Sequence, residues 1–182
     1  MLEETVLITL AEVQKVRYIT QHYDADKFAQ FAREVQRVYV LPLLGNSLYA
    51  DLLDNYEESN YDELLEGTTY ADGDETISFY GLKLYMIYMW LYLYSKEGGV
   101  FYTESGREEF DFQETKSIKT GLASEVLNNF KSNADRIAKQ VIKYLDDHTD
   151  DFDKWEVSPR ETKQLKDNSF TVFGKTFHRP EV

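Results

Sequence analysis

Apolar side chains recur at a helical spacing over most of the chain, and the clearest case lies in residues 120–147. There the hydrophobic positions follow one another at intervals of three or four residues, which places them on one face of a helix. The spacing predicts one long amphipathic helix over 120–147. The positions that form this stripe are Leu122, Val126, Phe130, Ala134, Ile137, Val141 and Leu145.

Two shorter helices are predicted nearer the N-terminus. Thr9 and Glu12 have the spacing of a capping box, which would begin a helix over 10–19. Asp24 is a favourable N-cap for a second, longer helix. Because Pro42 has no N–H to donate, we expect that helix to end or kink near Leu41. Its apolar stripe consists of Phe28, Phe31, Ala32, Val35 and Tyr39.

The next stretch is more polar and predicts less regular structure. Gly45 marks a break, after which a short amphipathic helix contains Leu48, Tyr49, Leu52 and Leu53. We expect residues 55–76 to form a loop with one helical turn, capped by Asn60 with Glu63 and ended by Gly67. The sequence of residues 72–75, DGDE, is typical of a polar turn.

The most apolar run of the chain, residues 82–94, contains one charge, Lys83. At 1.5 Å per residue the run gives roughly 20 Å of helix, which is short of the ~30 Å hydrocarbon core of a bilayer. We therefore predict a helix over 78–96 that protein buries on most sides, rather than a membrane span. Gly98 and Gly99 would end it, and the irregular stretch 100–119 leaves room for a short extended segment.

The composition changes at Ser158. Residues 158–182, here called the C-terminal arm, hold five bases and three acids, a charge of +2 within a chain of −13, so residues 1–157 carry −15. Residues 170–177 favour a β conformation, with Gly174 able to turn the chain. A segment this short cannot bury its apolar residues against itself. Either it packs on its own helices or it adds a strand to another chain. Its candidate contact residues are Phe170, Val172, Phe173 and Phe177.

These patterns together predict an all-α fold, an antiparallel bundle of about four main helices with an extended, β-prone arm. Residues 1–157 would form the body and 158–182 a docking arm. The absence of cysteine excludes a disulfide-stabilised fold and thiolate metal sites. The strong negative charge argues against a protein that grips nucleic acid by neutralising phosphates. The acidic residues 1–4 argue against a signal peptide.

Candidate chemistry is sparse. The three histidines lie far apart, and we expect them to be isolated surface residues without a second ligand at metal spacing. The acidic residues of 72–75 are not followed by the other ligand positions of a calcium-binding loop. The acidic residues of 146–153 are typical of a charged helix end. Nucleotide-binding and hydrolase motifs are missing as well. We therefore expect no catalytic residue, no metal and no cofactor.

The chain has many aromatic residues, 15% of the total. Several tyrosines of the apolar run fall on different faces of one helix, where they would serve either the core or a protein–protein interface. The candidates for that role are Tyr85, Tyr88, Trp90 and Tyr92.

Several short stretches, in this order and spacing, resemble the helical head–tail connector (adaptor) proteins of phages, as found in phages and prophages of Bacteroides-type gut bacteria. The resemblance spans roughly residues 6–155. It departs from the family at residues 104–107, ESGR, where a loop of small residues with proline is expected. The residues that carry it are Leu7, Ile8, Thr9 and Glu12; residues 39–45 (YVLPLLG) with Leu48, Tyr49, Leu52 and Leu53; Leu65, Glu66, Gly67 and Tyr70; Gly81, Leu82 and Lys83; Thr103, Ser105 and Gly106; and Tyr144 and Leu145.

The resemblance implies a structural virion protein without catalysis, located at the head–tail junction and in the host cytoplasm during assembly. Subunits of this kind form a ring with copies of themselves, commonly a dodecamer, beneath the portal protein and next to other tail or connector proteins. DNA passes through the ring without specific binding. The C-terminal segment often binds the portal or a neighbouring subunit, and no membrane is involved.

The residue patterns agree with this function but also allow others. A wall of charge −15 would repel passing DNA phosphates, and a basic arm could dock on an acidic neighbour. One alternative is a cytoplasmic acidic helical adaptor that binds a single partner, for example an inhibitor that mimics DNA. Another is a small helical enzyme with an acidic site.

Overall fold

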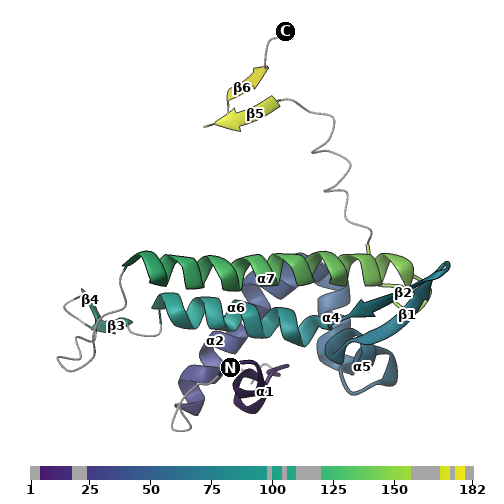
Figure 1. The fold of residues 1–182 in the computed structure, drawn as a ribbon, viewed down its shortest axis with the longest axis horizontal. Helices are drawn as coiled ribbons and strands as arrows, with labels where there is room; N and C mark the ends of the chain where they lie inside the picture. Colours follow the sequence, from purple (N-terminus) through teal and green to yellow (C-terminus); the bar gives the residue numbers. More distant parts are fainter. Residues whose placement is uncertain are drawn as a thin grey trace.

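Two long antiparallel helices, α6 (Leu82–Glu97) and α7 (Thr120–Asp147), form the centre of the protein (Figure 1). The structure is a computed structural model that describes residues 5–17, 24–97, 100–103, 106–109, 120–156, 169–172 and 175–178. The other helices are α1 (Leu10–Val16), α2 (Ala25–Val35), the π-helical turn η1 (Gln36–Val40), α3 (Leu41–Leu44), α4 (Asn46–Asn55) and α5 (Ser59–Glu66). The strands are β1 (Thr68–Asp72), β2 (Glu75–Phe79), β3 (Val100–Thr103), β4 (Gly106–Glu109), β5 (Ser169–Val172) and β6 (Lys175–His178).

Helix α6 is buried on most sides, as its apolar run predicts. Trp90 is fully buried at its centre, where the indole ring lies 5.2 Å from the ring of Phe28 and stacks on Tyr94. The indole N–H donates to the carbonyl oxygen of Phe28 at 3.3 Å, so the one polar atom of this side chain is paired within the core. The buried residues of α6 are Leu82, Tyr85, Met86, Ile87, Met89, Trp90, Leu91 and Leu93.

The structure confirms the helix predicted over 120–147, because α7 begins and ends at the predicted residues. Five positions of its predicted stripe are buried against the core: Phe130, Ala134, Ile137, Val141 and Leu145. Val126 is 42% exposed, so among the described side chains of the stripe burial begins at Phe130. The side chain of Leu122 lies outside the described residues.

Both predicted N-terminal caps are confirmed. Thr9 and Glu12 form a reciprocal capping box at α1, and this helix ends at Val16 rather than at residue 19. The Asp24 carboxylate accepts hydrogen bonds from the backbone N–H groups of Asp26 and Lys27 at the start of α2. These caps satisfy N–H groups that have no partner inside the helix.

The predicted effect of Pro42 is corrected, because the chain stays helical to Leu44. The α-helical ladder widens earlier, at η1, where the N–H of Leu41 bonds to the carbonyl of Gln36, five residues back. Pro42 then falls in the first turn of α3, a position that tolerates a missing N–H donor. Gly45, with φ of +79°, ends the helix, and α4 follows as expected.

Residues 55–79 differ most from the prediction. The predicted helical turn is the longer helix α5, which ends at Gly67 as expected but has Glu58 and not Asn60 at its N-cap. The hairpin β1–β2 then takes the place of the predicted loop. The predicted polar turn connects the two strands, with Asp72 paired to Glu75. Because Ser78 and Phe79 belong to β2, α6 begins at Leu82 and not at residue 78.

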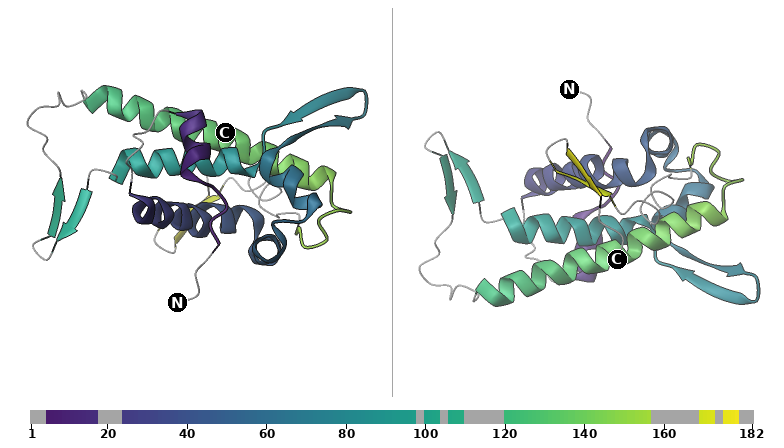
Figure 2. Two further views of the ribbon diagram at one scale, coloured as in Figure 1. Left: turned by 90° about the horizontal axis from the view of Figure 1, so that it is seen from below. Right: turned by 90° about the horizontal axis from the view of Figure 1, so that it is seen from above.

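The prediction of a helical bundle is therefore confirmed in part: the fold is mostly helical, but the described residues also form three two-stranded antiparallel hairpins. Figure 2 shows β1–β2 projecting from the end of the bundle where α6 begins, and β3–β4 at the opposite end. Strands β5 and β6 pair within the β-prone part of the arm. Among the described residues, no helix combines the length and hydrophobicity needed to cross a membrane.

Two glycines bring the end of α5 against the start of α6. Gly67 (φ +93°) and Gly81 (φ +82°) both have left-handed backbones that disfavour other residues. A Cβ at Gly67 would lie 2.5 Å from the carbonyl oxygen of Phe79, and one at Gly81 would lie 2.5 Å from that of Leu65. The two backbones are thus in direct contact, which fixes where α5 and α6 meet.

We predict that Gly81→Ala destabilises the fold more than Gly45→Ala. Gly45→Ala is the control, because Gly45 has nearly the same φ, +79°, but no atom lies within 4 Å of a Cβ there. Its loss of stability should therefore come from backbone strain alone, about 1–2 kcal/mol. Gly81→Ala adds the overlap with Leu65. Urea denaturation measures both values, and equal losses of stability would contradict the close contact.

Candidate functional site

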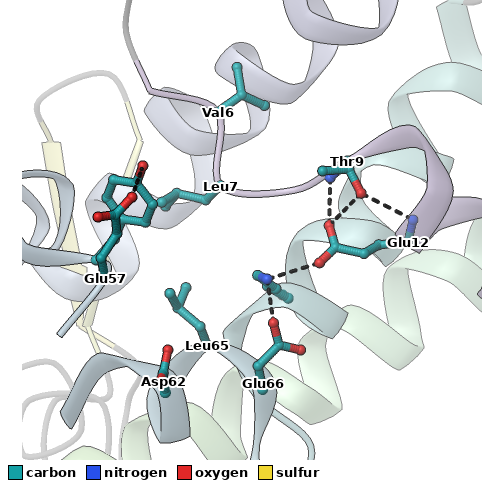
Figure 3. Close-up of a pocket in the computed structure, with 10 residues that line it drawn as sticks. Val6, Leu7, Thr9, Glu12, Glu57, Asp62, Leu65 and Glu66 are labelled. Atoms are coloured by element: carbon teal, nitrogen blue, oxygen red, sulfur yellow. Dashed lines mark hydrogen bonds and ion pairs between the residues drawn. The ribbon is translucent and has the colours of Figure 1, made fainter. Parts of the chain in front are cut away.

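A pocket lies between residues 6–12 and α5, and is here called the N-terminal pocket (Figure 3). It has a volume of about 430 Å³. Residues of the N-terminal segment and α1 line one side, and α5 with the turn before it lines the other. The lining residues are Val6, Leu7, Thr9, Glu12, Tyr56, Glu57, Asp62, Leu65, Glu66 and Lys83.

Lys83 connects the three elements around this pocket. Its ammonium donates to Glu12 Oε1 at 2.8 Å, on α1, and to Glu66 Oε1 at the end of α5. Lysine is unfavourable so close to a helix N-terminus because of the helix dipole. The two carboxylates compensate for this unfavourable position, and the lysine side chain is only 21% exposed.

The pKa values in this network reflect the pairing. Burial alone would raise the pKa of the Glu12 carboxyl, but hydrogen bonds from Lys83 and from Thr9 lower it below its usual value. Burial alone would lower the pKa of Lys83, yet its bonds to Glu12 and Glu66 raise it. Glu12 and Lys83 are therefore both charged at neutral pH.

Gln36 fixes the other end of the N-terminal segment. Its side chain is fully buried at the start of η1. The amide oxygen accepts from the N–H of Leu7 at 2.9 Å, and the amide nitrogen donates to the carbonyl of Thr5 at 2.8 Å. One glutamine thus supplies both hydrogen bonds that a neighbouring strand would supply, and it holds residues 5–7 in place beside the pocket.

The pocket combines an apolar interior with a negative rim. Leu7 and Leu65 are buried, whereas Glu57 and Asp62 are exposed. Four carboxylates and one ammonium line it, a net charge of −3. The wider surroundings are also acidic, because residues 38–82 contain no Lys or Arg. The ten acids of this stretch are Asp51, Asp54, Glu57, Glu58, Asp62, Glu63, Glu66, Asp72, Asp74 and Glu75.

This chemistry suits a cationic side chain with an aliphatic stem. Lysine and arginine bury such stems on apolar surface and keep the charged group at a polar edge. In the part of the chain that the structure describes, no three His, Asp or Glu side chains are grouped closely enough to hold a metal.

An aromatic cluster joins the hairpin β1–β2 to the end of α7. The ring of Tyr144 stacks on Phe79 at 4.3 Å and on His148 at 4.2 Å, and its hydroxyl donates to Glu63 at 3.1 Å. Burial is the largest cause that raises the pKa of Tyr144. The prediction that the histidines are isolated surface residues is wrong for His148, which is half-buried here. His22 and the side chain of His178 lie outside the described residues.

The acids at the end of α7 have structural partners in this region. The Asp147 carboxylate accepts from the Tyr70 hydroxyl at 2.8 Å and from Lys143 at 2.9 Å, and Lys143 also bonds Asp72 at 2.7 Å. Asp146 accepts from the indole N–H of Trp155 at 2.8 Å. The contacts attach the hairpin and the chain after α7 to the bundle.

The residues predicted as interface candidates lie in different environments. Trp90 and Tyr85 are core residues, whereas Tyr88 and Tyr92 are half-buried. In the arm, Phe170 lies opposite Phe177 in the register of β5 and β6, and Val172 opposite Lys175. Phe173 lies outside the described residues, as do the side chains of the other three.

The predicted candidates did not include the residues that form the pocket. Lys83 gave a signal, as the one charge in an apolar run, because a buried lysine needs acidic partners. The sequence could not identify those acidic partners, because Glu12 lies 71 positions away from Lys83. Gln36 gave no signal, since one glutamine in a helical pattern looks like any surface residue.

The chain belongs to a protein family of unknown function, DUF6712, whose match covers residues 40–164. That range includes α4 to α7 and the α5 side of the N-terminal pocket, but not residues 6–12. No curated protein and no solved structure matches the chain.

We predict that Lys83→Met lowers the free energy of unfolding by about 1–3 kcal/mol at pH 7, because it leaves Glu12 partly buried without its cation. Since the pKa of Glu12 is lowered in the folded chain, its stabilising effect is present at neutral pH and disappears as the pH falls below about 4.5. The difference between the two proteins should therefore shrink on acidification, as urea denaturation at pH 7 and pH 3 would show.

Lys131→Met is the matched control. Lys131 pairs with Asp135 at 3.3 Å on the exposed face of α7, with 53% of its own side chain accessible. Its loss should cost less than about 0.5 kcal/mol at either pH. If Lys83→Met behaved like this control, the network would have no structural role.

We also predict that Gln36→Leu destabilises the protein by about 1–3 kcal/mol, because the N–H of Leu7 and the carbonyl of Thr5 lose their partners. Hydrogen exchange should show faster exchange at the amide of Leu7, with α7 unchanged. Gln30→Leu, at an exposed position of α2, is the control and should alter neither property. Unchanged exchange at Leu7 would contradict the role given to Gln36.

Proposed function

We propose that this protein is a structural subunit of a phage virion, a ring-forming head–tail connector that joins the portal to the tail. The observation that carries the proposal is the arrangement of the stretches that resemble connectors. Three of them, 7–12, 65–67 and 81–83, are far apart in the sequence but meet around Lys83 and the Gly67–Gly81 contact. A resemblance carried by short stretches is stronger when they build one structural junction.

The charge distribution supports a wall along which DNA can pass. The body carries −15, and its α4, α5 and β1–β2 region has acids without any base. Such a surface repels phosphate at distances comparable to the Debye length, about 8–10 Å at physiological salt. A ring of these subunits would therefore allow a duplex to move through it without binding.

The remaining features of the proposal follow from the same role. The subunit would form a closed ring with copies of itself, commonly twelve, and contact the portal and other connector or tail proteins. It would act at the head–tail junction of the virion, after a period in the host cytoplasm, without catalysis or a cofactor. The C-terminal arm would supply contacts to another chain.

Sedimentation velocity of the full chain, alone and mixed with the portal protein of the same genome, tests this function. We predict closed rings of many copies, either alone or on the portal. A chain that stays at 21.4 kDa in both conditions would instead support a cytoplasmic adaptor or inhibitor. Binding of a DNA-processing enzyme rather than the portal would identify the DNA-mimic alternative.

Deletion of residues 158–182 is the matching variant. Because the described core lies within residues 7–155, we predict that the shortened chain keeps its helical circular dichroism and its cooperative unfolding but no longer assembles. Loss of the helical signal would show that the arm belongs to the core. Normal assembly would show that it makes no essential contact.

A further inference from the structure

We propose that the N-terminal pocket receives a basic side chain from the C-terminal arm of a second copy of this chain. The inference rests on the proposed function and extends it, because it names the receptor for the arm. It starts from the pocket geometry and from the opposite charges of two parts of one chain.

The carboxylates of the pocket fall into two groups. Glu12 and Glu66 are occupied by Lys83 from within the chain. Figure 3 shows Glu57 and Asp62 at the pocket, and among the described residues neither forms an ion pair with that lysine. Glu57 accepts one hydrogen bond, from the Tyr56 hydroxyl at 3.1 Å, and Asp62 has no side-chain partner among the described residues. Two negative groups at the α5 side therefore remain for an incoming cation.

The interior of the pocket favours a long side chain over a free ion. Val6 and Tyr56 are half-buried and offer apolar surface at the pocket, whereas Leu7 and Leu65 are only 5% and 4% exposed. An arginine or lysine would place its methylene groups on these residues and its charged end beside Glu57 and Asp62. A small hydrated ion would gain nothing from the apolar part.

The arm has the composition that this pocket requires. Its bases, Arg160, Lys163, Lys166, Lys175 and Arg179, outnumber its acids, and its β-prone apolar residues lie between Lys166 and Arg179. Its first residues follow Trp155, which is tied to α7 through Asp146. Electrostatic attraction between an arm of +2 and a pocket of −3 favours their encounter.

A second copy is the occupant that fits a ring. A ring with head-to-tail interfaces needs two different surfaces on each subunit. One surface of each subunit contacts the other surface of the next subunit, so all interfaces are the same. The arm and the pocket are such a pair. The described body also buries Trp90, Ile137 and the rest of its core without the arm, which leaves the arm available to a neighbour.

A labelled synthetic peptide of residues 158–182 tests the docking directly. It is titrated into the full chain in which Arg160→Ala, Lys163→Ala and Lys166→Ala weaken the chain's own arm. We expect saturable binding, detected by fluorescence anisotropy, that weakens about tenfold or more when Asp62→Lys is added. Asp54→Lys, an exposed acid on α4 outside the pocket, is the control and should weaken binding far less. No binding, or equal losses for the two substitutions, would overturn the proposal.

Mixing two variants tests whether the contact joins two copies. The pocket variant carries Glu57→Lys and Asp62→Lys with an intact arm, and the arm variant carries the three substitutions above with an intact pocket. Each alone should remain monomeric. Their mixture should form a one-to-one complex of twice 21.4 kDa and no larger species, because only one arm and one pocket match. No complex in the mixture would show that the arm docks within its own chain or elsewhere, which overturns the proposal.

The two proposals fail in different ways. If both variants still form the rings of the unchanged chain, the pocket is not the contact, while the ring-forming function stands. If the mixture forms the one-to-one complex but the unchanged chain never closes into a ring or binds the portal, the pocket contact stands and the connector function falls.

Discussion

One partly buried lysine determines how the elements around the pocket fit together. Lys83 stands at the start of the most apolar helix of the chain, where the helix dipole disfavours a cation, and two carboxylates from α1 and α5 compensate. The Gly67–Gly81 contact and the Gln36 hydrogen bonds position the same region from its other sides. Removing the lysine would leave Glu12 partly buried without a cation, which is why we treat this network as the basis of the pocket.

The long periodic elements could be predicted from the sequence, and the junctions between them could not. The stripe of α7, the apolar run of α6 and the caps at Thr9 and Asp24 are local patterns, and the structure confirms them. The full length of α5 and the hairpin β1–β2 were missed because most of their residues are polar. Their stability comes from contacts distant in sequence, such as Tyr144 with Glu63 and Phe79.

The structure also changes where the proposed assembly contacts should be sought. Trp90 and Tyr85, which the sequence left open between core and interface, are used by the core of a single chain. Oligomerisation would then depend on features outside that core: an acidic pocket, the half-buried Tyr88 and Tyr92, and a basic arm. Contacts of this polar kind depend on the salt concentration and on the charge of the partner.

Cryo-electron microscopy of the assembled full chain tests the central claim most directly, namely that these subunits join arm to pocket. The account predicts a closed ring in which side-chain density from the neighbouring arm enters the space between residues 6–12 and α5, next to Glu57 and Asp62. A closed ring in which that space is empty at every interface, with the arm bound elsewhere, would contradict it.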